Sequence, residues 1–108
     1  MIELREKDRM AICAVAAQCF SAGTAIWAYG SRVQGTCYEA SDLDLVVHFP
    51  EGQASGESHA QLAEFIEALR DSNVPIIVQA LAWQAIPEYF RANIEQCYEV
   101  LWTAPSVC

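Results

Sequence analysis

The sequence predicts an α/β domain in which a small mixed β-sheet is backed by helices. Two nearly uninterrupted apolar runs, residues 24–29 and 43–49, are typical of strands covered on both faces. Segments around these runs carry apolar residues at three- and four-residue spacing, which predicts helices that bury one face. Strands that alternate with helices indicate helices layered on a sheet. Since the chain has 108 residues, we expect one domain over residues 1–108.

The first half of the chain is predicted to hold a helix, a strand, a short helix and a second strand. Residues 4–22 form the first helix, which ends before Gly23. Its apolar residues share one face: Ile12, Val15, Ala16, Cys19 and Phe20. A strand is expected over 24–29, a short helix over 31–36 and a second strand over 42–49. The short helix would direct free backbone N–H groups toward the space in front of its first turn.

The middle of the chain is predicted to form a loop and a long helix. Residues 51–57 are polar and contain two glycines, which favours a loop. Ser58 and Gln61 have the spacing of a capping box, so we expect the helix to begin there and to close at Asn73. Its apolar stripe is formed by Leu62, Phe65, Ile66 and Leu69.

The last third is predicted to form a strand, a helix and a short final strand. Residues 75–82 are apolar apart from Gln79 and form the third strand. Pro87 opens the last helix, because proline suits the first helical turn. Phe90, Ile94 and Cys97 share a face of that helix, and Val100-Leu101-Trp102 adds a short strand.

One motif combines a tight Gly-Ser turn with two carboxylates. Gly30-Ser31 ends the first strand, and Asp42-x-Asp44 opens the second after the ten residues 32–41. Alternate residues of a strand point to one face, so both aspartates can converge on one cation. Mg²⁺ is held by one or two carboxylates together with substrate phosphates, and the Gly-Ser turn would bind those phosphates. The alternative is a surface turn beside two solvated aspartates, but aspartate is depleted in strands and costly to bury without a cation.

This motif resembles the signature of the polymerase-β-like nucleotidyltransferase superfamily, and the short chain is similar to its minimal nucleotidyltransferase (MNT) branch. The resemblance covers most of the chain and implies the polymerase-β-like nucleotidyltransferase fold. It implies that Asp42 and Asp44 bind Mg²⁺ and are catalytic, while Gly30, Ser31 and Arg32 bind the nucleotide, with ATP as the expected substrate. Several members act as antitoxins beside a helical HEPN partner, and active members transfer AMP to a tyrosine of that partner.

The chain departs from this family at the third strand, where a further carboxylate is expected. Gln79 is the best match for that position, and residues 74–86 contain no Asp or Glu. A neutral amide cannot act as a base near pH 7 and is a weaker Mg²⁺ ligand than a carboxylate. Nucleotide and metal binding would survive this change, whereas efficient transfer requires a replacement acid, either Glu88 or a group from a partner.

Two functions therefore follow from the sequence. The first is an Mg²⁺-dependent enzyme that transfers AMP from ATP to a protein or small-molecule hydroxyl, slowly because of Gln79. The second is an antitoxin-type subunit with a residual nucleotide pocket that neutralises a helical HEPN-like partner by binding. Both functions are compatible with a chain that assembles into a homo-oligomer or a hetero-oligomer.

Composition excludes several other classes. The chain has 14 acidic and 6 basic residues, a net charge of -8, which argues against binding to long nucleic acid. No stretch has the roughly 20 apolar residues that a membrane span needs. Five cysteines without a Cys-x-x-Cys pair indicate reduced thiols, so we expect a cytoplasmic protein. A high hydrophobic fraction, 54%, fits either a partner surface or a dense core.

Aromatic residues and histidines are expected to be structural. Trp27, Trp83 and Trp102 lie in separate predicted elements and would fill the core or a partner surface. His48 lies late on the second strand and is expected to pack there. Neither His48 nor His59 has the pattern of a base for a cysteine nucleophile.

Overall fold

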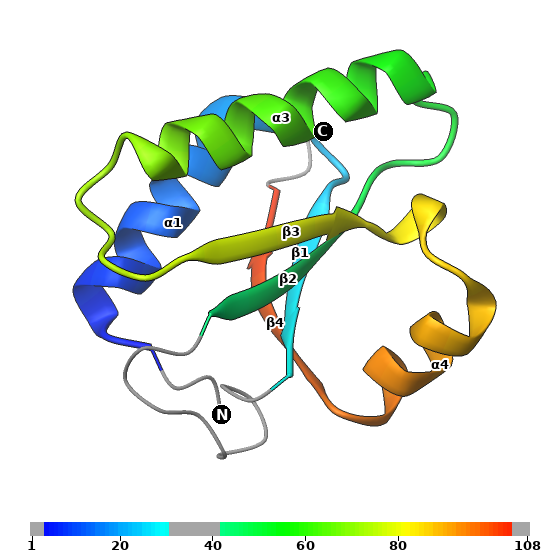
Figure 1. Cartoon of the computed structure of the whole chain (residues 1–108). Helices are drawn as coiled ribbons and strands as arrows, with labels where there is room; N and C mark the ends of the chain where they lie inside the picture. The colour runs from blue at the N-terminus through cyan, green and yellow to red at the C-terminus, as the bar shows by residue number, and fades with distance from the viewer. Residues whose placement is uncertain (1–3, 31–41, 105–108) are drawn as a thin grey trace.

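The computed structural model describes residues 4–30 and 42–104 as a four-stranded mixed sheet with helices on both faces (Figure 1). Its elements, in chain order, are α1 (Glu6–Cys19), β1 (Ala25–Tyr29), β2 (Leu43–His48), α3 (Ser55–Arg70), β3 (Val78–Ala82), the 3₁₀ turn η1 (Trp83–Ala85), α4 (Glu88–Gln96) and β4 (Tyr98–Thr103). This arrangement confirms the predicted α/β class. The short helix expected over 31–36 lies outside the described residues.

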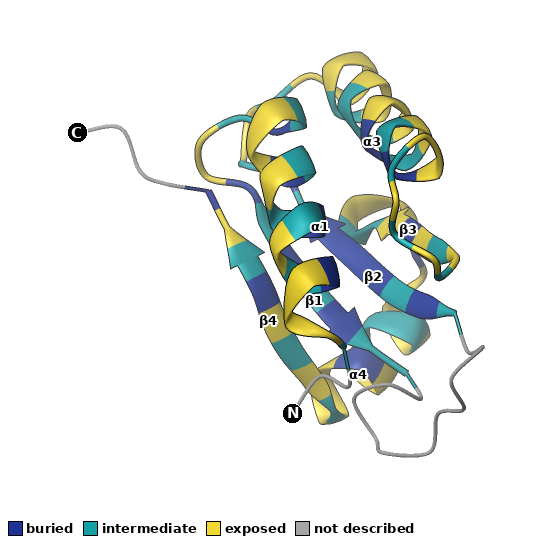
Figure 2. Ribbon diagram, turned by 90° about the vertical axis from the view of Figure 1, so that its left-hand side faces the viewer, coloured by how far each residue is buried: buried dark blue, intermediate teal, exposed yellow. Residues whose placement is uncertain are grey.

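The strands are ordered β3-β2-β1-β4. β1 pairs antiparallel with β2 and with β4, whereas β2 pairs in parallel with β3. The parallel pair is joined through α3, because a parallel connection must cross back over the sheet. β3 and β4 are therefore the two edges, and β1 and β2 are the inner strands, which are the most buried ones in Figure 2.

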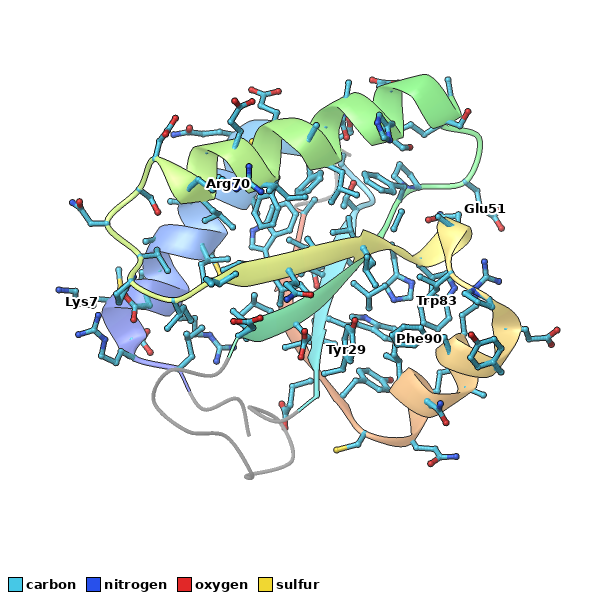
Figure 3. All side chains as sticks on the ribbon, in the orientation of Figure 1. Lys7, Tyr29, Glu51, Arg70, Trp83 and Phe90 are labelled. Atoms are coloured by element: carbon cyan, nitrogen blue, oxygen red, sulfur yellow. The ribbon has the colours of Figure 1, made fainter. Side chains whose placement is uncertain are left out.

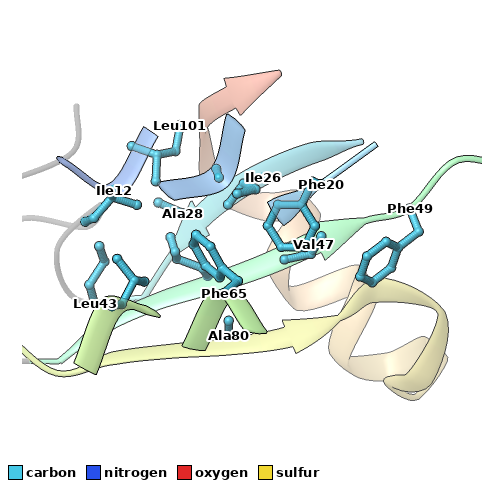
Figure 4. Close-up of a cluster of buried hydrophobic side chains, with 13 residues drawn as sticks. Ile12, Phe20, Ile26, Ala28, Leu43, Val47, Phe49, Phe65, Ala80 and Leu101 are labelled. Atoms are coloured by element: carbon cyan, nitrogen blue, oxygen red, sulfur yellow. The ribbon is translucent and has the colours of Figure 1, made fainter. Parts of the chain in front are cut away.

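One face of the sheet packs against α1 and α3 and forms the main core. Alternate residues of β1 and β2 point to this face, including Ile26, Leu45 and Val47, all fully buried. Figure 4 shows Phe65 of α3 at the centre of this cluster, and its ring lies 5.0 Å from that of Phe20. The predicted apolar stripes of both helices therefore face the sheet.

The opposite face packs against α4 over part of its area. A smaller cluster forms there around Val46, Ile86 and Ile94. Tyr29 and Phe90 contact it from the sheet and from the helix, with their rings 5.8 Å apart and nearly perpendicular (Figure 3). This face also carries Asp44, near the start of β2, whereas α4 packs further along the strand, around Val46.

The capping box predicted at Ser58 and Gln61 is wrong. α3 begins three residues earlier, at Ser55, with Ala54 at its N-cap and no side-chain cap. Ser58 and Gln61 instead hold the preceding loop: the Gln53 side-chain amide donates to both, at 3.0 and 3.2 Å. Gln61 also donates to the Ser21 hydroxyl at 2.9 Å, which ties α3 to the turn after α1.

Other boundaries differ by a few residues. α1 ends at Cys19 and α3 at Arg70, each three residues before the predicted end. β4 is longer than expected and spans the whole length of β1 as an edge strand. None of the helices within the described ranges is long and apolar enough to cross a bilayer. Cys13, Cys19 and Cys97 are free thiols, in agreement with the sequence.

Candidate functional site

Gly30 turns the chain at the end of β1 and lies directly against a carboxylate. Its φ is +83°, in the left-handed region that favours glycine. A Cβ built at this position would lie 2.6 Å from Oδ2 of Asp44, which is closer than real Cβ contacts. The backbone angle therefore favours glycine here, and a Cβ at this position would displace the Asp44 carboxylate.

Asp42 and Asp44 lie side by side at the start of β2. Asp44 is the second residue of the strand, and Asp42 immediately precedes its first residue, so both point to the face that α4 partly covers. Both aspartates are half-buried. Burial raises the pKa of the Asp44 carboxyl, and the negative charge of Asp42 raises it further. Two like charges held together this way are a pair that a bound cation would stabilise.

Gln79 occupies the position opposite these aspartates on β3. In the parallel register it is the partner of Asp44, and its side-chain Nε2 donates a hydrogen bond of 2.7 Å to Oδ2 of Asp42. The sequence-based placement of Gln79 beside the aspartates is therefore confirmed. Across residues 4–30 and 42–104, no three His, Cys, Asp or Glu side chains come together, so Glu88, exposed on the first turn of α4, does not complete the group.

Of the predicted phosphate-binding residues, only Gly30 can be placed. Ser31 and Arg32 lie outside the described residues. Gly30 directly follows β1 and lies against Asp44 of the neighbouring strand β2. The three predicted site residues that the structure describes, Gly30, Asp42 and Asp44, thus lie together at one end of the sheet.

Tyr29 is a site neighbour that the sequence did not single out. It is paired with Asp44 across β1 and β2 and points to the same face. Burial raises the pKa of its hydroxyl, and the charge of Asp44 adds to that shift. Only the strand register reveals this contact, since the two residues are far apart in sequence.

Four rings form an aromatic cluster further along the same face: Trp27, His48, Trp83 and Tyr98. Trp27 stacks on Tyr98 with centroids 4.0 Å apart, and His48 stacks on Trp83 at 4.3 Å. Burial, aided by the nearby Arg91 charge, lowers the pKa of His48 to about 4, so its ring is neutral near pH 7. His48 is therefore a packing residue, as the sequence indicated, and Trp27 and Trp83 come from separate elements, as expected, with their rings 5.4 Å apart.

The donor set fits a magnesium ion. Mg²⁺ prefers oxygen ligands and is commonly held by one or two carboxylates while it keeps several waters. Asp42 and Asp44 supply such a pair, and Gly30 leaves space beside Asp44 that any side chain would fill. The Gln79 side chain meets Asp42 through its amide nitrogen, and its amide oxygen is a neutral donor, weaker for Mg²⁺ than a carboxylate.

The raised pKa of Asp44 predicts a stability gain on neutralisation. A carboxyl whose pKa is higher in the folded than in the unfolded chain destabilises the fold when ionised, and this cost disappears below its ordinary pKa of 3.8. We therefore expect Asp44→Asn to raise the free energy of unfolding at pH 7 by less than about 1 kcal/mol, because solvent screens the pair.

Thermal unfolding measured from pH 7 to pH 3.5 without divalent metal checks this prediction. The stability that Asp44→Asn gains over the unmodified chain should shrink as the pH falls. The matched control Glu51→Gln, at an exposed loop position, should change the melting temperature little at either pH. With Mg²⁺ added, the unmodified chain should become more stable than Asp44→Asn, because only the unmodified chain gains stability from the ion. A variant less stable than the unmodified chain at pH 7 would contradict the electrostatic account of the pair.

The chain matches known nucleotidyltransferases in sequence and in fold. Residues 15–101 match the family described as nucleotidyltransferase domain. Over 78 residues, 70% of this chain, it is 37% identical to a probable protein adenylyltransferase, MntA, of Haemophilus influenzae. The match spans 63% of the length of that curated relative.

Two solved structures with a similar fold are toxin-antitoxin structures. One is a toxin-antitoxin crystal structure with AMP-PNP, with a TM-score of 0.61 and 17% identity, covering 94% of this chain and 75% of that one. Another is a tri-AMPylated Shewanella oneidensis HEPN toxin in complex with its MNT antitoxin, with a TM-score of 0.61 and 12% identity, covering 94% and 74%. At these identities the likeness establishes the fold alone.

Proposed function

Because the chain belongs to the nucleotidyltransferase domain family, we propose that it is a member of the minimal nucleotidyltransferase branch that binds ATP with Mg²⁺ and transfers AMP slowly to a protein hydroxyl. The 108 residues are proposed to act as one nucleotidyltransferase-like domain in the cytoplasm. The observation that carries the proposal is the packing of Gly30 against the Asp44 carboxylate, beside Asp42.

Each residue of the site has a proposed role. Asp42 and Asp44 would hold Mg²⁺ through their carboxylate oxygens. The backbone of Gly30, the hydroxyl and N–H of Ser31 and the guanidinium of Arg32 would bind the phosphates. A bound Mg²⁺ would supply charge neutralisation for the triphosphate and for the pyrophosphate that leaves. Tyr29, paired with Asp44 across the two inner strands, would lie beside the bound ion on the same face of the sheet.

The relatives support the choice of nucleotide and reaction. A solved structure of the same fold was determined with AMP-PNP, an ATP analogue, and the curated relative is a probable protein adenylyltransferase. An AMPylated HEPN toxin accompanies the MNT antitoxin in another complex. By analogy, the acceptor here is proposed to be a tyrosine of a helical HEPN-like partner.

Slow transfer is proposed because of Gln79. Its side chain is a neutral amide whose Nε2 donates to Asp42, and because it is neutral it can neither accept the proton of an attacking hydroxyl nor add negative charge for a second metal. Positioned general bases contribute about 10²–10⁴-fold to rates. The alternative function is an antitoxin-type subunit without transfer, which neutralises its helical partner by binding, and the same substitution supports it.

Labelled ATP distinguishes these two functions. The chain is incubated with ATP labelled in the α-phosphate and Mg²⁺, with and without a co-expressed helical partner, and covalent label on protein is measured. Slow Mg²⁺-dependent labelling that Asp42→Ala abolishes supports the enzyme. Neutralisation of the partner without any label supports the binding subunit. Rapid labelling by Asp42→Ala would contradict the proposed role of the acid pair in transfer.

A further inference from the structure

The outer edge of β3 carries backbone groups that no strand of the described chain pairs with. β3 is an edge of the sheet, and its inner side pairs with β2. The Ile77 carbonyl accepts from Leu43 N–H at 2.9 Å and so faces β2. Backbone groups alternate between the two sides of a strand, so those of Val78 and Ala80 face outward. This edge can therefore accept a further strand.

The outer edge lies in a groove between β3 and the end of α3. The groove has a volume of about 710 Å³ and is lined by residues from both elements and the turn between them: Ile66, Leu69, Arg70, Val74, Pro75, Ile76, Ile77, Val78, Gln79, Ala80 and Leu81. Arg70, on the last turn of α3 (Figure 3), is the one charged side chain in this lining. Ile77 is 67% and Leu81 38% exposed, on the same face of β3 as Gln79.

The groove is continuous with the candidate site. Gln79 lines the groove and also donates to Asp42. In a paired strand, the residue opposite Gln79 would point to the same face as Gln79. An added strand would lie about 10 Å from β2, which is two strand spacings. A long side chain on it would therefore reach across Gln79 toward the acid pair.

We propose that the acceptor of the transfer binds as an extended segment that adds a strand to the outer edge of β3. This inference rests on the proposed function and specifies how its acceptor is held. The backbone of the segment would pair with Val78 and Ala80, and its apolar side chains would cover Ile77 and Leu81. An acidic residue of the segment would meet Arg70, because opposite charges favour that contact. The hydroxyl-bearing residue would lie opposite Gln79.

Amide hydrogen exchange of the full chain, followed by NMR, tests this proposal. The probe is a synthetic peptide of alternating threonine and valine with one central tyrosine and a flanking glutamate. At saturating peptide, exchange at Val78 and Ala80 should slow by at least about 10-fold. The amides of β4, the other sheet edge, should not change. Binding without protection at Val78 and Ala80 would overturn the proposal.

Two comparisons, one between N-methylated peptides and one between protein variants, test the proposal further. Peptides N-methylated at every second residue, in the two complementary patterns, should differ by at least about 10-fold in affinity, because only one pattern blocks the side that pairs with β3. Equal affinities would overturn strand addition. Arg70→Ala should weaken the unmodified peptide about 3-fold or more, whereas Lys7→Ala on α1, outside the groove, should not.

Two further measurements separate this inference from the proposed function. Protection of Val78 and Ala80 in the free chain that rises with its concentration would assign the edge to a second copy and overturn the proposal. Mg²⁺-ATP is titrated into the same sample. If Mg²⁺-ATP binds while the β3 amides stay unprotected, strand addition alone fails. If Mg²⁺-ATP does not bind, the proposed function fails, and with it the acceptor role of the segment.

Discussion

Replacement of Gln79 with aspartate is expected to raise the rate of AMP transfer by about 10²–10⁴-fold, the contribution of a positioned general base. Gln79 already lies opposite Asp44 in the sheet and reaches Asp42 with its side chain, so an acid at this position joins the pair without rearrangement of β3. The new carboxylate can take the proton of the attacking hydroxyl and provide a further oxygen for metal.

Gln79→Asn is the matched control for this substitution. Asparagine has the size of aspartate but is neutral, so any gain specific to Gln79→Asp comes from charge and basicity. Rates are measured with labelled ATP, Mg²⁺ and the partner present. Without Mg²⁺, Gln79→Asp should lower the melting temperature, since three carboxylates then repel one another. Robust labelling by the unmodified chain that Gln79→Asp does not improve would contradict the proposed cause of slow transfer.

Gly30→Ala is expected to destabilise the fold by about 1.5–3.5 kcal/mol, the sum of a left-handed backbone and a displaced Asp44 side chain, and to abolish binding of Mg²⁺-ATP. An L-residue at φ +83° costs about 1–2 kcal/mol, and the new Cβ would lie 2.6 Å from Oδ2 of Asp44, so the carboxylate or the turn must move. Either movement disturbs the site. Because 1 kcal/mol shifts the melting temperature of a small domain by about 4–8 °C, thermal unfolding resolves the effect.

Gly52→Ala is a close control, because Gly52 has the same φ of +83° with no atom within 4 Å of the added Cβ. This substitution should lower the free energy of unfolding by about 1–2 kcal/mol, the cost of a left-handed backbone at a residue with a Cβ, and should leave nucleotide binding intact. In the double variant Gly30→Ala with Asp44→Ala the contact is gone, so the stability loss should fall toward that of Gly52→Ala. Equal losses for both single glycine variants would show that the Asp44 contact has no effect on stability.

Much of the fold could be predicted because local patterns agree with tertiary packing. The apolar run that became β1 is buried between two layers, and the stripe centred on Phe65 faces the sheet. The start of α3 could not be predicted from Ser58 and Gln61, because both side chains bond to Gln53 and hold the loop instead of capping the helix. Such competition among polar partners depends on how the loop packs.

The part of the candidate site that depends on local sequence spacing could also be predicted. Asp42 and Asp44 are two residues apart, so strand geometry alone places them on one face. The Gly30 contact with Asp44 and the Gln79 bond to Asp42 depend on strand order and register, which spacing does not determine. Tyr29 was missed because its partner across the sheet is known only once that register is known.

Binding of Mg²⁺-ATP by Asp42 and Asp44 is the central claim, and calorimetric titration tests it most directly. ATP is titrated into the unmodified chain with Mg²⁺ and again with a chelator in place of Mg²⁺. It is also titrated with Mg²⁺ into Asp42→Ala, which removes one half-buried carboxylate directly before the start of β2. We predict saturable binding that requires Mg²⁺ and is lost in the variant, while its melting temperature shows that it remains folded. No binding by the unmodified chain, or equal binding by Asp42→Ala, would contradict the claim.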